Sequence, residues 1–281
     1  MIRQLHPEDQ TYYEQMDTGI EDDYIAAIFP HLVTGPNKMY GLFIENQLVS
    51  TAGFTIYHSV YAMLGRLRTD RRYRGQNLAT EIISNVLDKA WGHSAIQWVG
   101  ANTQQSNVPA QKVLTKIGLT PLISLQSATT TSPNQLADNH AQWTEITTLS
   151  KKKALLSEQY IQPGRVFPYE CYYPFEAKTE LFNDDEVATW RFFMNEQRDR
   201  FFIAKYDQKK YHYLHVLYPF DDLFDQPGLW STITQTYSDS RVLFEEEVHV
   251  WIDLTSDQLE KLPKQHPFNL PSPWNLYVDQ R

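Results

Sequence analysis

The chain contains one cysteine, Cys171, in 281 residues, and it has no long uninterrupted apolar run. A single cysteine excludes an internal disulfide and is typical of a protein from a reducing compartment. No stretch reaches the roughly 18 apolar residues that a membrane-spanning helix needs, and the first residues carry no apolar leader segment. We therefore expect a cytoplasmic protein with no membrane partner.

Positive charge is also scarce. The 25 Lys and Arg residues are outnumbered by 34 Asp and Glu, which gives a net charge of −9. A surface that follows nucleic-acid phosphates needs a positive face, so we expect no nucleic-acid partner. The histidine spacings do not form the ligand sets that hold zinc, so no metal site is predicted. Cys171 has no neighbouring base in the sequence and is expected to pack in a core.

The composition changes near residue 150. Of the 38 aromatic residues, 13 precede position 150 and 25 follow it. We therefore expect two domains, residues 1–150 and a smaller, aromatic-rich α+β domain at residues 151–281. Its aromatic residues are expected to form its core. Two alternatives are that they wall a substrate pocket or form a homodimer surface, because aromatic residues are enriched at interfaces.

The hydrophobic periodicity of residues 1–150 predicts alternating strands and helices, and hence an α/β fold with a mixed sheet. Helices are expected at 7–16, 20–29, 77–91 and 110–117, and strands at 2–5, 39–45, 48–57, 59–69 and 96–102. A final strand pair is expected at 122–126 and 143–149. Beyond residue 150 the pattern predicts helices at 184–195 and 229–237, a hairpin of 201–205 with 211–217, and a strand at 242–254.

Residues 67–83 are the most informative segment. They predict a strand, an arginine-rich turn, a loop of small residues and an amphipathic helix. Backbone N–H groups and the positive end of the helix dipole meet at the start of such a helix and favour a bound phosphate or pyrophosphate. Considered alone, the arginines are more typical of a solvated face, and the adjoining loop and helix favour a phosphate site. Five arginines fall within nine positions here: Arg66, Arg68, Arg71, Arg72 and Arg74.

Two motifs resemble those of the GNAT (GCN5-related) N-acetyltransferases. The run Arg74-Gly75-Gln76-Asn77-Leu78-Ala79 resembles the acetyl-CoA loop of that family, Gln/Arg-x-x-Gly-x-Gly/Ala. Residues 107–119, beginning Asn107-Val108-Pro109-Ala110 and ending Gly118-Leu119, resemble its Asn-x-x-Ala…Gly-Phe segment. The resemblance covers about residues 1–150. It implies the GNAT acyl-CoA N-acyltransferase fold, acetyl-CoA as co-substrate, and transfer of the acetyl group to a primary amine of a small molecule or protein.

The resemblance also implies which residues contact the co-substrate and which could act as an acid or base. The acetyl-CoA contacts that it implies are Leu67, Thr69, Arg74, Gly75, Gln76, Asn77, Leu78, Ala79, Thr80 and Asn107. No catalytic base is identified. Asp23 and Tyr24 border the acceptor groove in the family, and His58 ends a central strand, so these three are weak candidates. Each is also a common surface or packing residue.

Two positions depart from the family pattern. Asn77 stands where glycine is usual, although asparagine is among the few side chains tolerated at positive φ. Leu114 stands where many members carry a tyrosine that protonates the departing thiolate. An alternative is therefore a non-catalytic acyl-CoA sensor or interaction protein, and a further one is a structural protein. Residues 151–281 lack the loop, so a degenerate GNAT-like half that binds no CoA is one interpretation of them.

Overall fold

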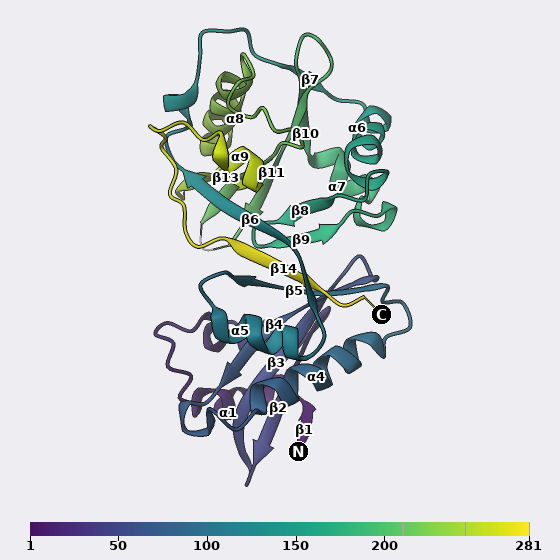
Figure 1. Ribbon diagram of the computed structural model, residues 1–281, viewed down its shortest axis with the longest axis vertical. Helices are drawn as coiled ribbons and strands as arrows, with labels where there is room; N and C mark the ends of the chain where they lie inside the picture. Colours follow the sequence, from purple (N-terminus) through teal and green to yellow (C-terminus); the bar gives the residue numbers. More distant parts are fainter. Residues whose placement is uncertain (210, 245, 281) are drawn as a thin grey trace. The chain divides into compact units, whose positions relative to one another are not determined.

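The computed structural model describes residues 1–209, 211–244 and 246–280. Contacts within the chain divide it into two compact units (Figure 1). Unit 1 comprises Met1–Leu122 and the C-terminal residues from Asn275, and unit 2 comprises Ile123–Trp274. These bounds differ from the expected division at residue 150. The reason is that residues 123–150 make their contacts within unit 2, whereas the C-terminal residues make theirs within unit 1.

Unit 1 is built on a mixed sheet with the strand order β1-β2-β3-β4-β5-β14. Neighbours from β1 to β4 are antiparallel, and β4 and β5 are parallel. Its strands are β1 (Ile2–Gln4), β2 (Asn37–Ile44), β3 (Gln47–Tyr57), β4 (Tyr61–Thr69), β5 (Trp98–Gln104) and β14 (Trp274–Val278). Its helices are α1 (Gln10–Glu14), α2 (Tyr24–Ala27), α3 (Phe29–Leu32), α4 (Leu78–Trp91) and α5 (Val108–Lys116).

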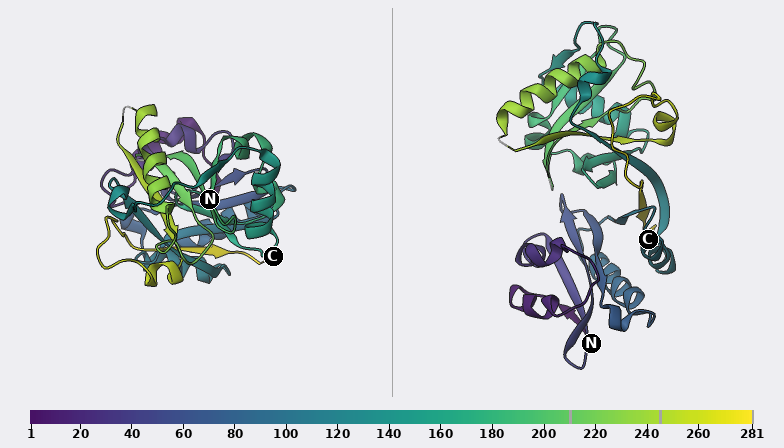
Figure 2. Two further views of the ribbon diagram at one scale, coloured as in Figure 1. Left: turned by 90° about the horizontal axis from the view of Figure 1, so that it is seen from above. Right: turned by 90° about the vertical axis from the view of Figure 1, so that its left-hand side faces the viewer.

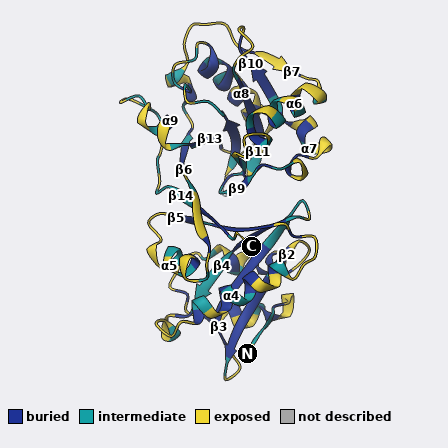
Figure 3. Cartoon of the chain, turned by 45° about the vertical axis from the view of Figure 1, so that its right-hand side comes forward, coloured by how far each residue is buried: buried dark blue, intermediate teal, exposed yellow. Residues whose placement is uncertain are grey.

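Both faces of this sheet are covered, because successive side chains of a strand point to opposite faces. On β2, Met39 and Phe43 pack with the side chains of α1–α3, whereas Tyr40 and Leu42 pack with those of α4. Most of β2 and β3 is therefore buried (dark blue in Figure 3). The predicted apolar face of α4 is confirmed, since its four residues are at most 8% exposed: Leu78, Ile82, Val86 and Ala90.

Unit 2 has its own mixed sheet, with the strand order β6-β13-β12-β11-β10-β7. Its strands are β6 (Thr120–Thr130), β7 (Thr144–Ile146), β10 (Arg191–Met194), β11 (Phe201–Gln208), β12 (His212–Leu217) and β13 (Val248–Leu254), and β8 (Val166–Glu170) and β9 (Tyr173–Glu176) form a separate hairpin. Its helices are α6 (Leu149–Leu156), α7 (Asp184–Thr189), α8 (Leu229–Leu243) and α9 (Ser256–Glu260). Buried Cys171 packs with Tyr213 and Trp251, as expected.

The order and sense of the strands in unit 2 repeat those of unit 1. In the right-hand view of Figure 2, α8 is the long yellow-green helix of unit 2. β7 is antiparallel to β10, β10 to β12 are successively antiparallel, and β12 and β13 are parallel. The helix α8 connects β12 to β13, as α4 connects β4 to β5. A short helix follows the parallel strand in both units. The two units therefore share one topology.

Four sequence predictions about elements are wrong. The single helix expected at 20–29 is divided into α2 and α3, and residues 20–23 lie outside both. The strands near 122–126 and 143–149 do not pair with each other, because β6 pairs with β13 and β7 pairs with β10. The expected helix at 184–195 ends at Thr189, and the segment Arg191–Met194 is the strand β10, in keeping with the strand preference of its two phenylalanines. The strand expected at 242–254 is β13, from Val248, because α8 continues to Leu243; residue 245 lies outside the described residues.

We predict that Tyr277→Ala destabilises unit 1, although position 277 lies at the far end of the chain. Tyr277 on β14 is 5% exposed and packs in the unit 1 core, so its removal leaves a cavity. We expect the free energy of unfolding to fall by about 3–5 kcal/mol in urea titrations, with faster hydrogen exchange in β5. Val242→Ala, at an 86% exposed side chain, is the control. Unchanged exchange in β5 would contradict the place of β14 in this sheet.

Candidate functional site

The strands β4 and β5 separate partway along their length. Their parallel pairing runs from Tyr61 with Trp98 to Leu64 with Ala101 and stops there. Residues 65–69 of β4 lie beyond the last pair; Gly65, Arg68 and Thr69 remain paired with β3, and residues 66–67 between them form a bulge. Leu67 and Thr69 are in this segment, and the Thr69 hydroxyl is 2.9 Å from the Ser50 hydroxyl on β3. The carboxyl ends of the two parallel strands therefore form an open V.

The loop after β4 turns through two residues with left-handed backbone. Gly75 has φ +80° and Asn77 has φ +64°, which confirms that asparagine tolerates the conformation for which glycine is usual. A Cβ added at Gly75 would meet no atom within 4 Å. α4 then begins at Leu78, and its first N–H groups, at Leu78, Ala79 and Thr80, have no acceptor within a helix. The loop thus presents an open helix N-terminus.

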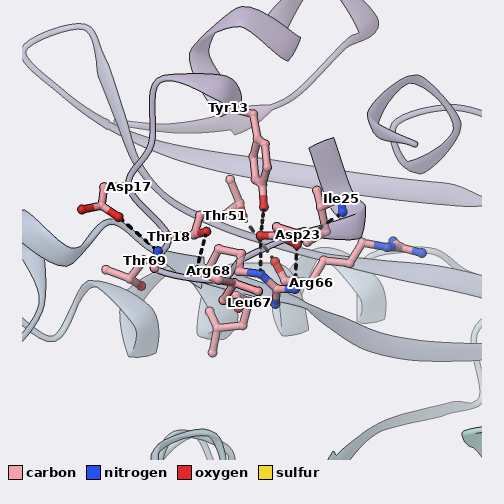
Figure 4. A network of polar contacts seen from close by, with 12 residues as sticks. Tyr13, Asp17, Thr18, Asp23, Ile25, Thr51, Arg66, Leu67, Arg68 and Thr69 are labelled. Atoms are coloured by element: carbon pink, nitrogen blue, oxygen red, sulfur yellow. Dashed lines mark hydrogen bonds and ion pairs between the residues drawn. The ribbon is translucent and has the colours of Figure 1, made fainter. Parts of the chain in front are cut away.

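The arginine cluster has a different role from the one that its sequence suggested. The guanidinium groups contact protein partners, as Arg68 contacts Asp23 in Figure 4, and four of the five arginines have a partner in residues 15–23, which connect α1 to α2. We call this segment the strap. Arg68 pairs with Asp23, Arg71 donates to the Gly19 carbonyl, and Arg74 donates to the Thr18 carbonyl at 2.8 Å. Arg72 pairs with Asp70, and Arg66 donates to Asn37 and to the Phe54 carbonyl.

Asp70 links the strap to the loop. Its carboxylate accepts hydrogen bonds from the backbone N–H of Asp17 at 3.1 Å and of Arg72 at 2.9 Å. The Arg72 guanidinium also donates to it, and these hydrogen bonds, against the opposing effect of burial, lower the pKa of Asp70 to about 2. Asp70 is therefore ionised at neutral pH and holds the strap against the start of the loop.

Asp23, one of the three acid–base candidates, is the centre of a buried network. Its side chain is 8% exposed, and Arg68 donates to its two oxygens at 2.9 and 3.0 Å. The Tyr13 hydroxyl donates to it at 2.7 Å and the Ile25 N–H at 3.3 Å. Burial raises the pKa of Asp23, but the hydrogen bonds from Arg68 and Tyr13 together outweigh burial, so the pKa is lowered overall. The carboxylate is thus an anchor with four donors.

The other candidates lie in contrasting places. Tyr24 begins α2 and is 50% exposed, with its ring 5.8 Å from the Arg68 guanidinium carbon. His58 lies in the turn between β3 and β4, at the opposite end of β4 from Thr69, which is about 26 Å along an extended strand of this length. Leu114 is 5% exposed in the core. The structure therefore brings Asp23 and Tyr24, and not His58, to the end of β4 that precedes the loop.

The second sequence motif forms α5. The Asn107 side chain caps this helix by accepting from the Ala110 N–H at 3.3 Å, and Gly118 follows it with φ +95°. From the last turn of α5, Lys116 Nζ lies 2.5 Å from Asn77 Oδ1. Sequence reasoning missed Lys116, because only the folded chain brings the end of α5 to the start of α4. Asn107 thus caps the start of α5, and Lys116 in the last turn of the same helix contacts Asn77.

The comparisons with known proteins decide the family of this unit. Residues 2–119 match the family model described as the acetyltransferase (GNAT) family. Residues 2–119 form a GNAT acetyltransferase domain. No curated protein matches the sequence. In the described part of the chain, no helix has both the length and the apolar character needed to cross a membrane.

Solved structures share the fold of the whole chain. A GCN5-related N-acetyltransferase from Sphaerobacter thermophilus is 12% identical over 99% of this chain and 95% of its own, with a TM-score of 0.59. A candidate acetyltransferase from Thermoplasma acidophilum is 13% identical over 100% of both chains, with a TM-score of 0.55. At these identities the likeness shows the fold alone. The similarity in fold to these two proteins therefore extends over unit 2 as well as over the GNAT domain.

The start of α8 in unit 2 corresponds in topology to the loop of the GNAT domain, but it is filled. Gly228, with φ +74°, precedes α8 as Asn77 precedes α4. The Asp138 carboxylate accepts from the Gly228 N–H at 2.9 Å and from the Ser231 hydroxyl at 2.9 Å. Burial raises the pKa of Asp138, but these hydrogen bonds outweigh it and lower the pKa to about 2. A carboxylate of the chain itself occupies this helix start.

The two parallel strand pairs differ as well. β12 and β13 stay paired as far as Val216 with Ile252, and β12 ends at the next residue, Leu217. In the GNAT domain, five residues of β4 extend beyond the last pair with β5. Unit 2 therefore lacks the V that the GNAT domain has, within the residues that the structure describes.

We predict that Asp23→Ala lowers the free energy of unfolding by about 3–5 kcal/mol, because it leaves the guanidinium of Arg68, which is 18% exposed, without its carboxylate. Denaturant unfolding of the whole chain measures this. Asp17→Ala is the matched control, since Asp17 and Arg71 are both more than half exposed and 3.8 Å apart, and it is expected to cost under about 1 kcal/mol. Equal effects of the two substitutions would contradict the anchoring role of Asp23.

Proposed function

We propose that the chain is an N-acetyltransferase that transfers an acetyl group from acetyl-CoA to a primary amine. The observation that carries the proposal is the open V of β4 and β5 beside an open helix N-terminus, within a GNAT acetyltransferase domain. The V offers strand ends that are not paired with each other to the thioester arm of the substrate. The helix start offers N–H groups and a positive dipole to its phosphates.

The residues present fit acetyl-CoA. The left-handed loop leaves space at Gly75 and directs the first N–H groups of α4 outward, as a pyrophosphate requires. Leu67 and Thr69 line the β4 arm of the V, and Asn107 fixes the start of α5 after β5. The proposed contacts are Leu67, Thr69, Arg74, Gly75, Gln76, Asn77, Leu78, Ala79, Thr80 and Asn107.

In the proposed reaction a neutral amine attacks the thioester carbonyl, so that a C–N bond forms and the C–S bond breaks. Backbone N–H groups at residues 67–69 stabilise the oxyanion that develops on the carbonyl oxygen. The amine proton leaves through water, and the thiolate takes up a proton from solvent. Leu114 supplies no proton, but a thiol with an ordinary pKa of about 8.5 is a good leaving group without one. Positioning of the two reactants supplies much of the acceleration.

The acceptor is a cationic amine, such as a polyamine, an aminoglycoside or a protein amino group. The strap that borders the end of β4 exposes three carboxylates, at Asp17, Glu21 and Asp22, and their charges attract a cation before it loses its proton. The net charge of the chain, −9, has the same effect at longer range.

Thiol release from acetyl-CoA across a panel of these three amine classes tests the proposal. We expect release above the hydrolysis background with at least one class, together with calorimetric binding of one acetyl-CoA per chain, because the start of α8 is filled by Asp138. Binding without thiol release would support a sensor instead. No binding at millimolar acetyl-CoA would overturn both functions.

We predict that Ala79→Glu weakens acetyl-CoA binding by at least about 100-fold. The new carboxylate stands in the first turn of α4, where its negative charge repels the phosphates and competes with them for the positive end of the helix. Ala79→Gln, which adds similar bulk without charge, is the matched control and is expected to bind far more tightly. Calorimetric titration measures both. Equal losses for the two variants would indicate bulk as the cause and contradict a phosphate site here.

A further inference from the structure

The loop of the GNAT domain has a fixed cation that its sequence motif does not include. Lys116 lies in the last turn of α5, and its Nζ is 2.5 Å from Oδ1 of Asn77, the residue immediately before α4. Both side chains are on the surface. The contact therefore holds an ammonium group beside the open helix start and leaves it accessible from solvent.

The other cations of the loop are engaged with protein partners. Arg74 donates to the Thr18 carbonyl and Arg71 to the Gly19 carbonyl, both in the strap. Arg72 is paired with the Asp70 carboxylate. Glu81 is the acidic residue of the first turn of α4 and directly follows Thr80, the last of the N–H groups in question. Lys116 is thus a cation that the fold directs to the start of α4, while the guanidinium groups of Arg71 and Arg74 contact the strap.

We propose that Lys116 binds the pyrophosphate of acetyl-CoA and that Asn77 positions it. This inference rests on the proposed function. An ammonium group has three N–H donors, so one bond to Asn77 leaves two for phosphate oxygens. Asparagine keeps the left-handed backbone that the turn requires and adds a side-chain oxygen that glycine lacks. The departure from the family loop at position 77 therefore recruits a cation to the site.

Calorimetric titration of the full chain with CoA and with dephospho-CoA tests the role of Lys116. We expect Lys116→Ala to raise the Kd for each ligand about tenfold, because both carry the pyrophosphate. The salt dependence of binding should also weaken, since one cation is removed. Lys89→Ala is the control: it removes the same charge from an exposed residue near the opposite end of α4, and its Kd should match the wild type.

Asn77→Gly tests the positioning. Glycine keeps the turn but releases Lys116, so we expect a loss of about threefold to fivefold, smaller than that of Lys116→Ala. The double variant should bind as Lys116→Ala does, because Asn77 acts through Lys116. A double variant whose losses multiply would overturn the positioning role.

The outcomes separate this inference from the function on which it rests. If the wild type fails to bind CoA, the proposed function fails and this inference with it. If the wild type binds and Lys116→Ala binds equally well, the inference alone fails. A loss confined to CoA, with dephospho-CoA unchanged, would place the ammonium at the 3′-phosphate and overturn the pyrophosphate assignment.

Discussion

The buried ion pair of Asp23 and Arg68 is the interaction on which the geometry of the site depends. Arg68 lies on β4 one residue before its end, and Asp23 caps the short helix α2. The strap, residues 15–23, contains no helix or strand of its own, so its path is set by what it contacts. Because the pair is bidentate and largely buried, it fixes the strap to the strand that precedes the loop.

This constraint explains the crowding of arginines that marks the sequence. Their side chains fasten the strap, the turn and the end of β4 to one another, and the backbone of the same turn forms the loop. A ligand on the loop and an acceptor beside the strap would therefore contact parts of a single rigid assembly. Such positioning supplies much of the rate acceleration in a reaction that requires two substrates to be held in line.

The two units show how one topology diverges. In the GNAT domain the turn before the long helix is open, and an asparagine holds Lys116 beside it. In unit 2 the corresponding turn is closed by Asp138. The difference arises from a few side chains and from how far the parallel strands stay paired. The sheet order is the same in both, so the fold does not by itself decide which unit has a site.

Much of unit 1 could be predicted from the sequence because its signals are local. The periodicity of α4, the tolerance of Asn77 for positive φ and the Asn107 cap each depend on a few neighbouring residues. What escaped prediction depends on distant partners. The pairing of β6 with β13, the place of β14 beside β5, and the contact between Lys116 and Asn77 join positions far apart in the chain. Likewise, the arginine run indicated a positively charged surface, but the sequence could not show that these side chains donate hydrogen bonds to Asp23 and to carbonyls of the strap.

Hydrogen–deuterium exchange of the full chain with and without acetyl-CoA tests the account most directly. The account predicts that the ligand slows exchange in residues 74–80 and also in the strap, because Asp70 and the arginines couple them. It predicts no change at residues 226–232, where Asp138 already fills the start of α8. Protection at the start of α8, or protection of the loop without the strap, would contradict it.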